Sequence, residues 1–371
     1  MSAARVLRVG LWGPVPPPLG GIGVWTLRYL AGAAAAGLDV SLIDTSPKGH
    51  QISERSAFRV GRLHLAARSL WHLGGLLRRR RPDVVHLTTS LFWATAREAA
   101  ALALCRRARV PTVLHIHASS QIIQWREGLG RPQRLLLDAT LQSADCLLVL
   151  SRELEAYLRE VLPRQRIARI GNMVDLAPPG TPVLPPRQRL RVLFVGACTP
   201  LKGLTELADA MLGLPDAELI VVGDPGEAMD PQRGAALTEA LARLRATGRL
   251  TTAGELPPER TGQIYREVDV FALPSHREGL PTVLLEAMAA DLPCVVTGVG
   301  AIPEVIAGGL ALQVPVADVG ALRTALARLL GDASLRASLG SQAGFSVRAR
   351  YGVAAIMAQY RALYGDVCGP R

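Results

Sequence analysis

Short apolar runs alternate with helical stretches along most of the chain, and this alternation constrains the fold more than any other feature. Each run ends in a polar, proline-containing or glycine-containing loop. Since parallel strands need long crossover connections, the repeated order of strand, turn and helix predicts an α/β fold with parallel sheets and helices on both faces. The expected strands are Arg5–Trp12, Val40–Ile43, Asp83–Leu87, Thr112–Ile116, Cys146–Leu150, Arg191–Val195, Glu218–Val222, Val268–Leu273 and Cys294–Thr297.

A proline-rich stretch divides this alternation into two halves. Five prolines fall within residues 177–189, and the strand–helix order restarts after them. A chain of 371 residues is long enough for two domains, each with its own core. We expect doubly wound domains at 1–176 and 190–353, joined by a linker at 177–189 and facing a central cleft, with a helix at 354–371 that packs back on the first.

The charge balance is basic, but it does not point to one kind of partner. The chain has 42 lysines and arginines against 31 acidic residues, a formal charge of +11. Only Lys48 and Lys202 are lysines, so the basicity reflects heavy use of arginine. A basic surface suits nucleic acid, anionic lipid or simple solubility, and we expect no nucleic-acid partner.

Cysteine usage and hydropathy favour a cytoplasmic protein. The five cysteines are scattered and contain no CxxC pair, which argues against a disulfide framework or a zinc knuckle. The N-terminal residues lack the apolar core of a secretory signal, and no apolar run approaches the length of a membrane span. These features predict a cytoplasmic location.

The stretch 271–306, FALPSHREGLPTVLLEAMAADLPCVVTGVGAIPEVI, holds the most informative candidates. A buried strand ends before a polar loop, and Pro281 is expected as the first residue of a helix. Glu278 precedes this helix and Glu286 lies one to two turns inside it, where it is placed to accept from ligand hydroxyls. A capped helix with two solvent-facing glutamates is the alternative. The backbone N–H groups expected to form an anion site at the helix start belong to Gly279, Leu280, Thr282 and Val283.

The segments EGLPTVLLE, AMA, PCVVT and GVGAIPEVI resemble the E-x7-E region of the retaining glycosyltransferases of family 4, bacterial enzymes of the cell-envelope and polysaccharide type among them. The resemblance implies the GT-B fold, with two Rossmann-like domains. It also implies that Glu278 lies against the donor sugar and that Glu286 binds the nucleotide ribose.

A second segment extends the resemblance. Val195-Gly196 followed by Leu201-Lys202-Gly203-Leu204 is similar to the family element G-x5-K-G-[LV], whose lysine holds the donor diphosphate. A solvated surface lysine is the alternative for Lys202. Family members usually carry an arginine directly after this glycine, whereas this chain has Ala197.

The N-terminal half carries weaker marks of the same family. Gly20 and Gly21 resemble its glycine-rich loop, in which glycines allow positive φ or a close approach to a ligand. His117 matches a histidine at the end of a strand that faces the transferred sugar. His115, two residues earlier, is expected to pack in the core, a metal-binding pair being the alternative. Asn172 matches part of another family element near the cleft.

The resemblance implies a retaining, metal-independent hexosyl- or glycosyltransferase that needs no cofactor. The donor is a UDP- or GDP-sugar, and the acceptor is a glycan or a lipid-linked sugar in cell-surface polysaccharide or glycolipid synthesis. The expected catalytic residues are Glu278, His117 and Lys202. The expected donor- or substrate-binding residues are Gly20, Gly21, Asn172, Gly196, Gly279, Leu280, Pro281, Thr282 and Glu286.

The run Arg78-Arg79-Arg80-Arg81 follows an apolar stretch with Trp71. It suits peripheral binding at the anionic inner face of the plasma membrane. A helix that packs on the sheet, with arginines at the negative end of its dipole, is the alternative.

Three other functions fit parts of the sequence. A sugar-nucleotide epimerase or a phosphorylase-like enzyme has a similar two-domain organisation. A two-domain binding protein of the periplasmic type does so too, but it needs neither Lys202 nor Glu278. A catalytically inactive relative that acts as a binding or partner subunit is the third, and Ala197 is the main reason to consider it.

Overall fold

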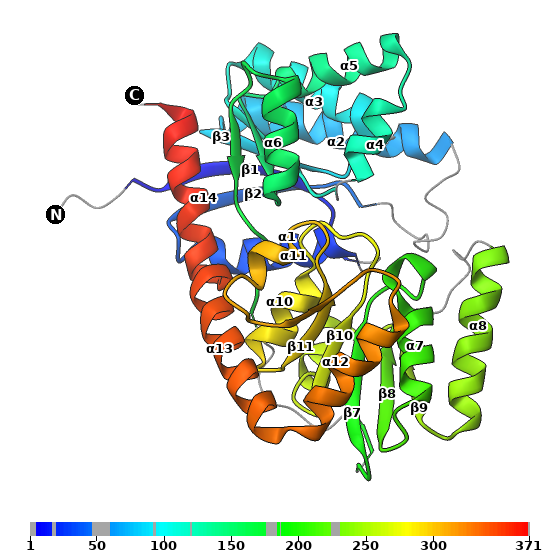
Figure 1. Cartoon of the computed structure of the whole chain (residues 1–371). Coiled ribbons are helices and arrows are strands. Elements are labelled where there is room, and N and C mark those ends of the chain that lie inside the picture. Colours follow the sequence, from blue (N-terminus) through cyan, green and yellow to red (C-terminus); the bar gives the residue numbers. More distant parts are fainter. Residues whose placement is uncertain are drawn as a thin grey trace. The chain divides into compact units, whose positions relative to one another are not determined.

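The computed structural model in Figure 1 describes residues 5–16, 20–46, 60–91, 94–118, 121–175, 184–185, 187–223 and 231–369. The chain forms two compact units. Unit 1 is Met1–Met173 with Val353–Arg371, and unit 2 is Val174–Gly352. Of the expected linker at 177–189, only residues 184–185 and 187–189 are among those described.

Unit 1 contains a six-stranded sheet in the order β2-β1-β3-β4-β5-β6, and all its neighbouring strands are parallel. This confirms the predicted parallel α/β architecture. The strands are β1 (Leu7–Gly13), β2 (Leu38–Asp44), β3 (Val84–Thr89), β4 (Thr112–Ile116), β5 (Cys146–Val149) and β6 (Ile167–Arg169). The helices are α1 (Gly21–Ala33), α2 (Val60–Arg79), α3 (Thr95–Ala108), α4 (Gln121–Glu127), α5 (Arg131–Gln142), α6 (Arg152–Val161) and α14 (Val353–Cys368).

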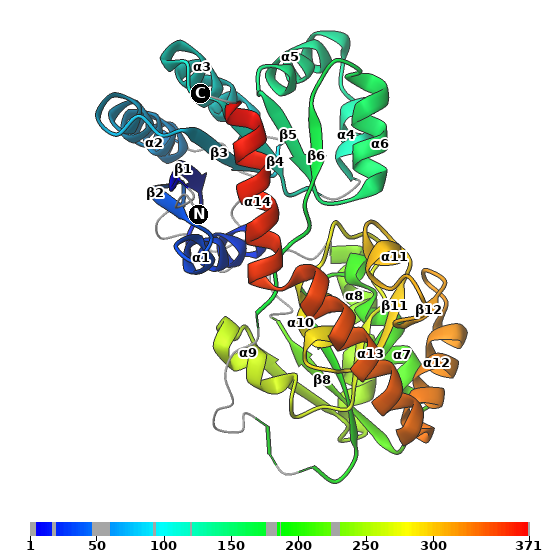
Figure 2. The ribbon, with the colours of Figure 1, turned by 90° about the vertical axis from the view of Figure 1, so that its left-hand side faces the viewer.

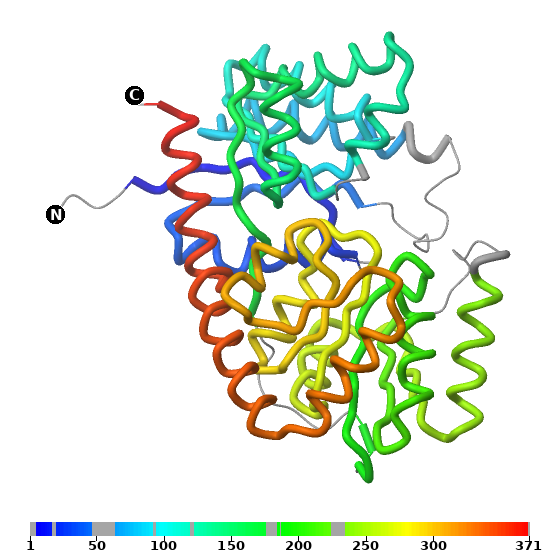
Figure 3. The backbone as a smooth tube through the Cα atoms, viewed as in Figure 1, coloured from blue at the N-terminus to red at the C-terminus, as the bar shows by residue number. Residues whose placement is uncertain are grey.

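Helices cover both faces of this sheet. Strand crossovers are right-handed, so α1, which leads outward from β1 to β2, lies on the face opposite to α2, α3 and α5. The last helix of the chain, α14, packs beside α1 and against β3 (Figure 2). The tube in Figure 3 shows this red C-terminal segment returning to the blue N-terminal strands of unit 1.

The two faces of the sheet bury different chemistry. On β3, Val85 and Leu87 belong to an apolar cluster with Leu73 and Leu77 of α2. Because side chains alternate along a strand, His86 between them points to the other face, toward α1 and α14. Histidines therefore line one side of the sheet while aliphatic residues fill the other.

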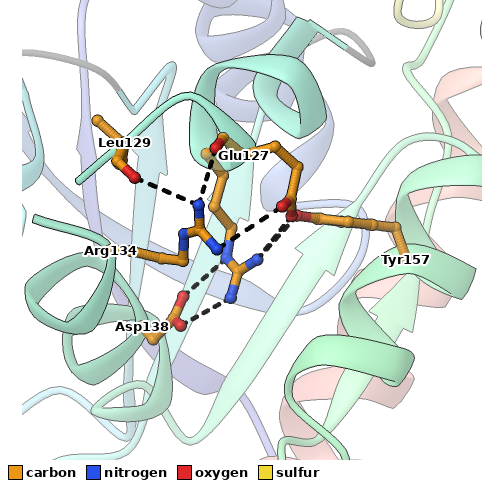
Figure 4. A network of polar contacts seen from close by, with 6 residues as sticks. Glu127, Leu129, Arg134, Asp138 and Tyr157 are labelled. Atoms are coloured by element: carbon orange, nitrogen blue, oxygen red, sulfur yellow. Dashed lines mark hydrogen bonds and ion pairs between the residues drawn. The ribbon is translucent and has the colours of Figure 1, made fainter. Parts of the chain in front are cut away.

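A polar network joins the three helices α4, α5 and α6 (Figure 4). The buried Arg126 guanidinium of α4 donates to both carboxylate oxygens of Asp138 on α5, at 2.9 and 2.7 Å, and to the hydroxyl of Tyr157 on α6 at 2.8 Å. Tyr157 also donates to Glu127, and Arg134 donates to the Glu127 carbonyl at 2.8 Å. The hydrogen bonds to Asp138 raise the pKa of Arg126 more than desolvation lowers it, so the guanidinium stays charged.

Unit 2 contains a second parallel sheet, in the order β12-β11-β10-β7-β8-β9. Its strands are β7 (Leu190–Val195), β8 (Ala217–Val222), β9 (Leu250–Gly254), β10 (Val270–Leu273), β11 (Cys294–Thr297) and β12 (Leu312–Val314). Its helices are a 3-10 turn (Pro200–Lys202), α7 (Leu204–Leu212), α8 (Pro231–Ala246), α9 (Pro258–Ile264), α10 (Thr282–Ala289), α11 (Ile302–Val305), α12 (Val319–Gly331) and α13 (Ala333–Tyr351).

The structure departs from the sequence-based expectation in two details. The short strands β6, β9 and β12 were not predicted, because they are partly exposed and lack a continuous apolar run. The prediction that Pro281 begins a helix was off by one residue, since Pro281 has an extended ψ of 118° and caps α10, which starts at Thr282. In the described part of the chain, we find no helix that is both long and apolar enough to cross a membrane.

Candidate active site

The topology of unit 2 explains why two loops far apart in sequence meet. Strands β7 and β10 are parallel neighbours, but the chain proceeds from β7 to β8 and from β10 to β11, in opposite directions across the sheet. Such a reversal is where open α/β sheets bind ligands, outside the carboxyl ends of the strands. The loop after β7 carries Lys202, and the loop after β10 carries Glu278.

The backbones of these two loops touch. The N–H of His276 donates to the carbonyl oxygen of Leu201 at 2.9 Å. Gly203 has φ of +69°, and a Cβ placed on it would lie 2.0 Å from the carbonyl oxygen of Pro274. Only glycine fits this close approach without moving the second loop.

Gly203→Ala is therefore expected to lower the free energy of unfolding of unit 2 by about 3 kcal/mol, through the clash with Pro274 and the positive φ. Chemical denaturation measures this change. Gly331→Ala is the matched control, because a Cβ there meets nothing within 4 Å. Equal stability of the two variants would contradict the close approach.

At the junction of the loops, Lys202 and Glu278 form an ion pair. The Lys202 ammonium lies 2.7 Å from Glu278 Oε1, and the hydroxyl of Ser275 donates to the same oxygen at 2.7 Å. Among the described residues, no hydrogen bond reaches Glu278 Oε2. The Glu278 side chain is 7% exposed and that of Lys202 is 29% exposed. The pair thus presents an accessible cation beside a largely buried carboxylate with one oxygen left to accept.

The loop that carries Glu278 is held from a third side. Thr297, at the end of β11, donates its hydroxyl to the carbonyl oxygen of Ser275. The N–H of Ala301 donates to the Gly279 carbonyl at 2.8 Å, and Gly300, with φ of +58°, passes so close that a Cβ would lie 2.2 Å from the Glu278 carbonyl oxygen. Three strand ends therefore fix the position of this carboxylate.

The start of α10 lies next to this loop. Leu280 and Pro281 are buried, Thr282 is the first helical residue, and no side chain caps the helix. One turn in, Glu286 accepts a hydrogen bond from the Tyr265 hydroxyl at 2.9 Å. Two roles were predicted for this segment: an anion site at the start of α10 and ribose binding by Glu286. The absence of a side-chain cap and the oriented Glu286 carboxylate are compatible with these roles, and both roles stay predictions.

The structure adds residues that the sequence reading missed. Ser275 and Thr297 support Glu278, Tyr265 orients Glu286, and His276 contacts Glu206 of α7 at 2.9 Å. Ser275 lies three residues before Glu278, a spacing that could have drawn attention to it. Nothing in the sequence places Tyr265 or Thr297 near these carboxylates.

The remaining candidates of unit 2 lie after β7. Gly196 directly follows the strand, and Ala197 beside it is exposed. The position where the family has an arginine is therefore a surface position on the loop that leads to Lys202.

The candidates of unit 1 lie at the carboxyl ends of its strands. His117 directly follows β4, and its N–H donates to the Thr89 carbonyl at 2.8 Å. Its ring lies 3.8 Å from that of His115 and 5.0 Å from that of Trp25, measured between centroids. Burial lowers the pKa of His117 to about 3, so the ring is neutral at pH 7.

The glycine-rich loop and Asn172 complete the unit 1 candidates. Gly20 is the N-cap of α1 with φ of −169°, Gly21 begins the helix, and neither has a positive φ. The backbone at these two glycines therefore does not use the positive φ that glycine allows, and their role in binding donor or substrate stays a prediction. Asn172 is buried just before the end of the first segment of unit 1.

The described residues contain neither a metal-ligand cluster nor a disulfide. In the ranges that the structure describes, no three His, Cys, Asp or Glu side chains gather so as to hold a metal ion. All five cysteines are free, and burial raises the pKa of the Cys146 thiol to about 11.

Comparison with protein families divides the chain much as the structure does. Residues 19–178 match the family model described as Glycosyltransferase Family 4, and residues 189–332 match the one described as Glycosyl transferases group 1. The D-inositol 3-phosphate glycosyltransferase of Segniliparus rotundus is 31% identical over 164 residues, which are 38% of this chain and 36% of that protein. The chain thus matches little more than a third of the length of this curated relative.

Solved structures share the whole fold. Sucrose-phosphate synthase from Thermosynechococcus elongatus superposes with a TM-score of 0.74 at 21% identity, over 97% of this chain and 99% of that one. HepE from Anabaena, solved in complex with UDP, gives 0.69 at 17% identity, over 97% and 100% of the two chains. From the family matches and this shared architecture, we conclude that the chain belongs to the family 4 glycosyltransferases and has their GT-B fold.

Proposed function

We propose that this protein transfers a sugar from a nucleoside diphosphate sugar to a glycan or lipid-linked acceptor, with retention at the anomeric carbon and without a metal ion. The observation that carries the proposal is the Lys202–Glu278 pair, in which a cation and a carboxylate sit 2.7 Å apart at the reversal point of the unit 2 sheet. The cation can stabilise a diphosphate leaving group, and the carboxylate can accept a hydrogen bond from a sugar hydroxyl.

Each residue has a defined part in the proposed reaction. Lys202 and the N–H groups at the start of α10 stabilise negative charge on the departing diphosphate. The free oxygen of Glu278 accepts from the donor sugar, and Glu286 accepts from the ribose. His117 contacts hydroxyls of the sugar, and Gly20, Gly21, Gly196 and Asn172 lie against donor or acceptor.

The proposed transfer takes place on one face of the sugar. The bond from the anomeric carbon to the diphosphate oxygen breaks while the bond to the acceptor oxygen forms on the same face. The proton of the acceptor hydroxyl passes to the departing diphosphate. This assigns no covalent nucleophile to the protein, and it leaves the side chains with positioning and charge stabilisation.

A panel of UDP- and GDP-sugars, incubated with pure protein and a metal chelator, tests the proposal. The readouts are release of nucleoside diphosphate and the shift in melting temperature. HepE is described in complex with UDP and with UDP-glucose, which supports starting from the UDP-sugars. We expect stabilisation and slow release with one donor. Release that occurs only when a divalent metal is restored would contradict the metal-independent mechanism.

An inactive relative is the second candidate, favoured by the exposed Ala197 in place of an arginine. Titration of UDP and GDP by calorimetry, separate from turnover, distinguishes the two. Binding without release from any donor would favour the inactive relative, and Ala197→Arg would then be the first variant to test for regained turnover.

We also propose that unit 1 binds an anionic membrane surface through the end of α2. Its apolar residues Leu73 and Leu77 are buried against the sheet, as expected from the alternative in which this helix packs on the sheet. Trp71, however, is 69% exposed, and Arg78 and Arg79 in the last turn are exposed too. Trp71 and Arg78 are seven residues, or about two turns, apart and so share one face of the helix.

Co-sedimentation with phosphatidylglycerol and phosphatidylcholine vesicles measures this binding. At about 1 kcal/mol for each arginine near the surface, Arg78→Gln with Arg79→Gln is expected to weaken binding to phosphatidylglycerol about 30-fold. The control removes the same charge from the exposed Arg323 and Arg328 of α12 and should leave binding unchanged. Equal binding to both vesicle types would contradict the proposal.

A further inference from the structure

A chain of hydrogen bonds joins four buried side chains of unit 1 that the proposed reaction does not use. The hydroxyls of Tyr29 on α1 and Tyr364 on α14 lie 2.7 Å apart. The Tyr364 hydroxyl lies 2.7 Å from Nδ1 of His86 on β3, whose Nε2 lies 3.2 Å from Nδ1 of His115 on β4. All four residues are fully buried.

The fold brings these four residues together from both ends of unit 1. His86 and His115 face α1 and α14 because their neighbours Leu87 and Leu114 belong to the apolar cluster on the other face of the sheet. Tyr364 comes from the last helix, 335 residues after Tyr29. The C-terminal helix therefore supplies a polar group to the interior of the N-terminal sheet.

His86 and His115 are both neutral at pH 7. Burial, with a smaller effect of His117, lowers the pKa of His86 to about 3 and that of His115 well below its usual value. A neutral imidazole has one N–H and one lone pair, so each ring passes on the direction of the hydrogen bond that it receives. The direction of the hydrogen bond between Tyr364 and His86 thus sets the direction of the bond between His86 and His115.

Three patterns satisfy every link, because the Tyr364 hydroxyl oxygen can accept two hydrogen bonds. In the first, Tyr29 donates to Tyr364, Tyr364 donates to His86 Nδ1, and His86 donates from Nε2 to His115 Nδ1. One N–H, on His115 Nε2, is left over, and this nitrogen is buried with no partner among the described residues.

The second pattern reverses every link and leaves more groups unsatisfied. The Tyr29 hydroxyl then needs a further acceptor, but within the described residues its only hydrogen bond is to Tyr364. It also leaves the His115 Nε2 lone pair unused. In the third pattern Tyr364 accepts from both Tyr29 and His86, so the Tyr364 hydroxyl proton has no acceptor among the described residues and the His115 Nε2 lone pair is again unused. Each pattern leaves one buried donor without an acceptor, but the second and third leave a lone pair unsatisfied as well, so the first pattern is favoured.

We propose that Tyr364 of the C-terminal helix fixes His86 and His115 as Nε2–H tautomers and, through the adjacent ring of His115, which is tilted by 39° against that of His117, positions His117. The Nε2 atom of His117 is also buried and without a partner among the described residues. A proton on this His117 Nε2 would have no acceptor in the part of the chain that the structure describes, so the proton is favoured on Nδ1 as a donor for a substrate hydroxyl, and the His115 ring, 3.8 Å away between centroids, holds the His117 ring in place. This last role rests on the proposed function.

Side-chain 15N NMR of the histidines tests the relay in the ligand-free protein. We expect Nε2–H signals for His86 and His115 in the wild type. Tyr364→Phe removes the donor to His86 Nδ1 and should give mixed tautomers at both rings. Tyr360→Phe is the matched control, because Tyr360 is equally buried one turn earlier and packs on the same rings outside the relay. An unchanged pattern in Tyr364→Phe would overturn the relay.

Kinetics test the positioning role with the donor found in the panel. Because histidine catalysis depends on the tautomer, Tyr364→Phe should lower kcat roughly tenfold or more while the donor KM stays near the wild-type value, and Tyr360→Phe should match the wild type. Mixed tautomers with an unchanged kcat would overturn the positioning of His117. A protein that transfers no sugar would contradict the proposed function, and the NMR result alone would then support or overturn the relay.

Discussion

Lys202→Ala is expected to lower kcat/KM for sugar transfer by about 10²–10³-fold, the usual cost of removing a group that stabilises charge in a transition state. The Lys202 ammonium lies 2.7 Å from the Glu278 carboxylate, and the 29% exposure of its side chain leaves it accessible to a diphosphate. UDP and GDP should also bind more weakly, because in the proposed reaction the same cation contacts both the bound and the departing diphosphate. Steady-state kinetics and calorimetry measure the two effects.

Leu201→Ala is the matched control for this variant. Leu201 is the preceding residue, it is 38% exposed, and its hydrogen bond with the second loop is made by its backbone carbonyl, which the substitution keeps. The control should keep activity and nucleotide affinity. Activity of Lys202→Ala within a few-fold of the wild type would remove Lys202 from the catalytic residues.

Glu278→Gln is expected to lower kcat by about 10²-fold while binding of UDP or GDP is kept or strengthened. The amide can still accept from Ser275, so the loop should keep its conformation. The charge that holds Lys202 is lost, which frees the ammonium for the diphosphate. The expected signature is thus opposite to that of Lys202→Ala in nucleotide affinity, although both variants lose turnover.

The double variant sharpens this comparison. Because Lys202 and Glu278 are in direct contact, the effects of the single changes on nucleotide affinity should not add. Loss of nucleotide affinity in Glu278→Gln comparable to that in Lys202→Ala would argue that the carboxylate contacts the nucleotide rather than the sugar.

The alternation of apolar runs and helices was sufficient to predict the two parallel sheets. Buried strands such as β5, β10 and β11 consist of continuous apolar or β-branched residues, and this pattern depends on local sequence alone. The edge strands β6, β9 and β12 were missed because a strand with one free side is partly exposed and need not be apolar. Local sequence thus predicts the centre of a sheet better than its edges.

The candidate site divides in the same way. Lys202, Glu278 and Glu286 were predicted from motifs, each of which lies within a few consecutive residues. Thr297 and Tyr265, which help to hold the carboxylates, lie on other elements, and no spacing in the sequence relates them to Glu278 or Glu286, whereas Ser275 lies three residues before Glu278 in the same loop. His115 was expected to pack in the core, and it does so, but as part of a polar relay.

The sequence by itself therefore determined the parallel α/β class, the family resemblance and the residues that carry charge at the site. The tertiary structure decided which groups meet: the Lys202–Glu278 pair across the β7–β10 reversal, and the link from Tyr364 near the end of the chain to His86. The physical reason is that strand and helix patterns depend on neighbours in sequence. Contacts between loops and returning helices depend on strand order, which a single sequence does not state.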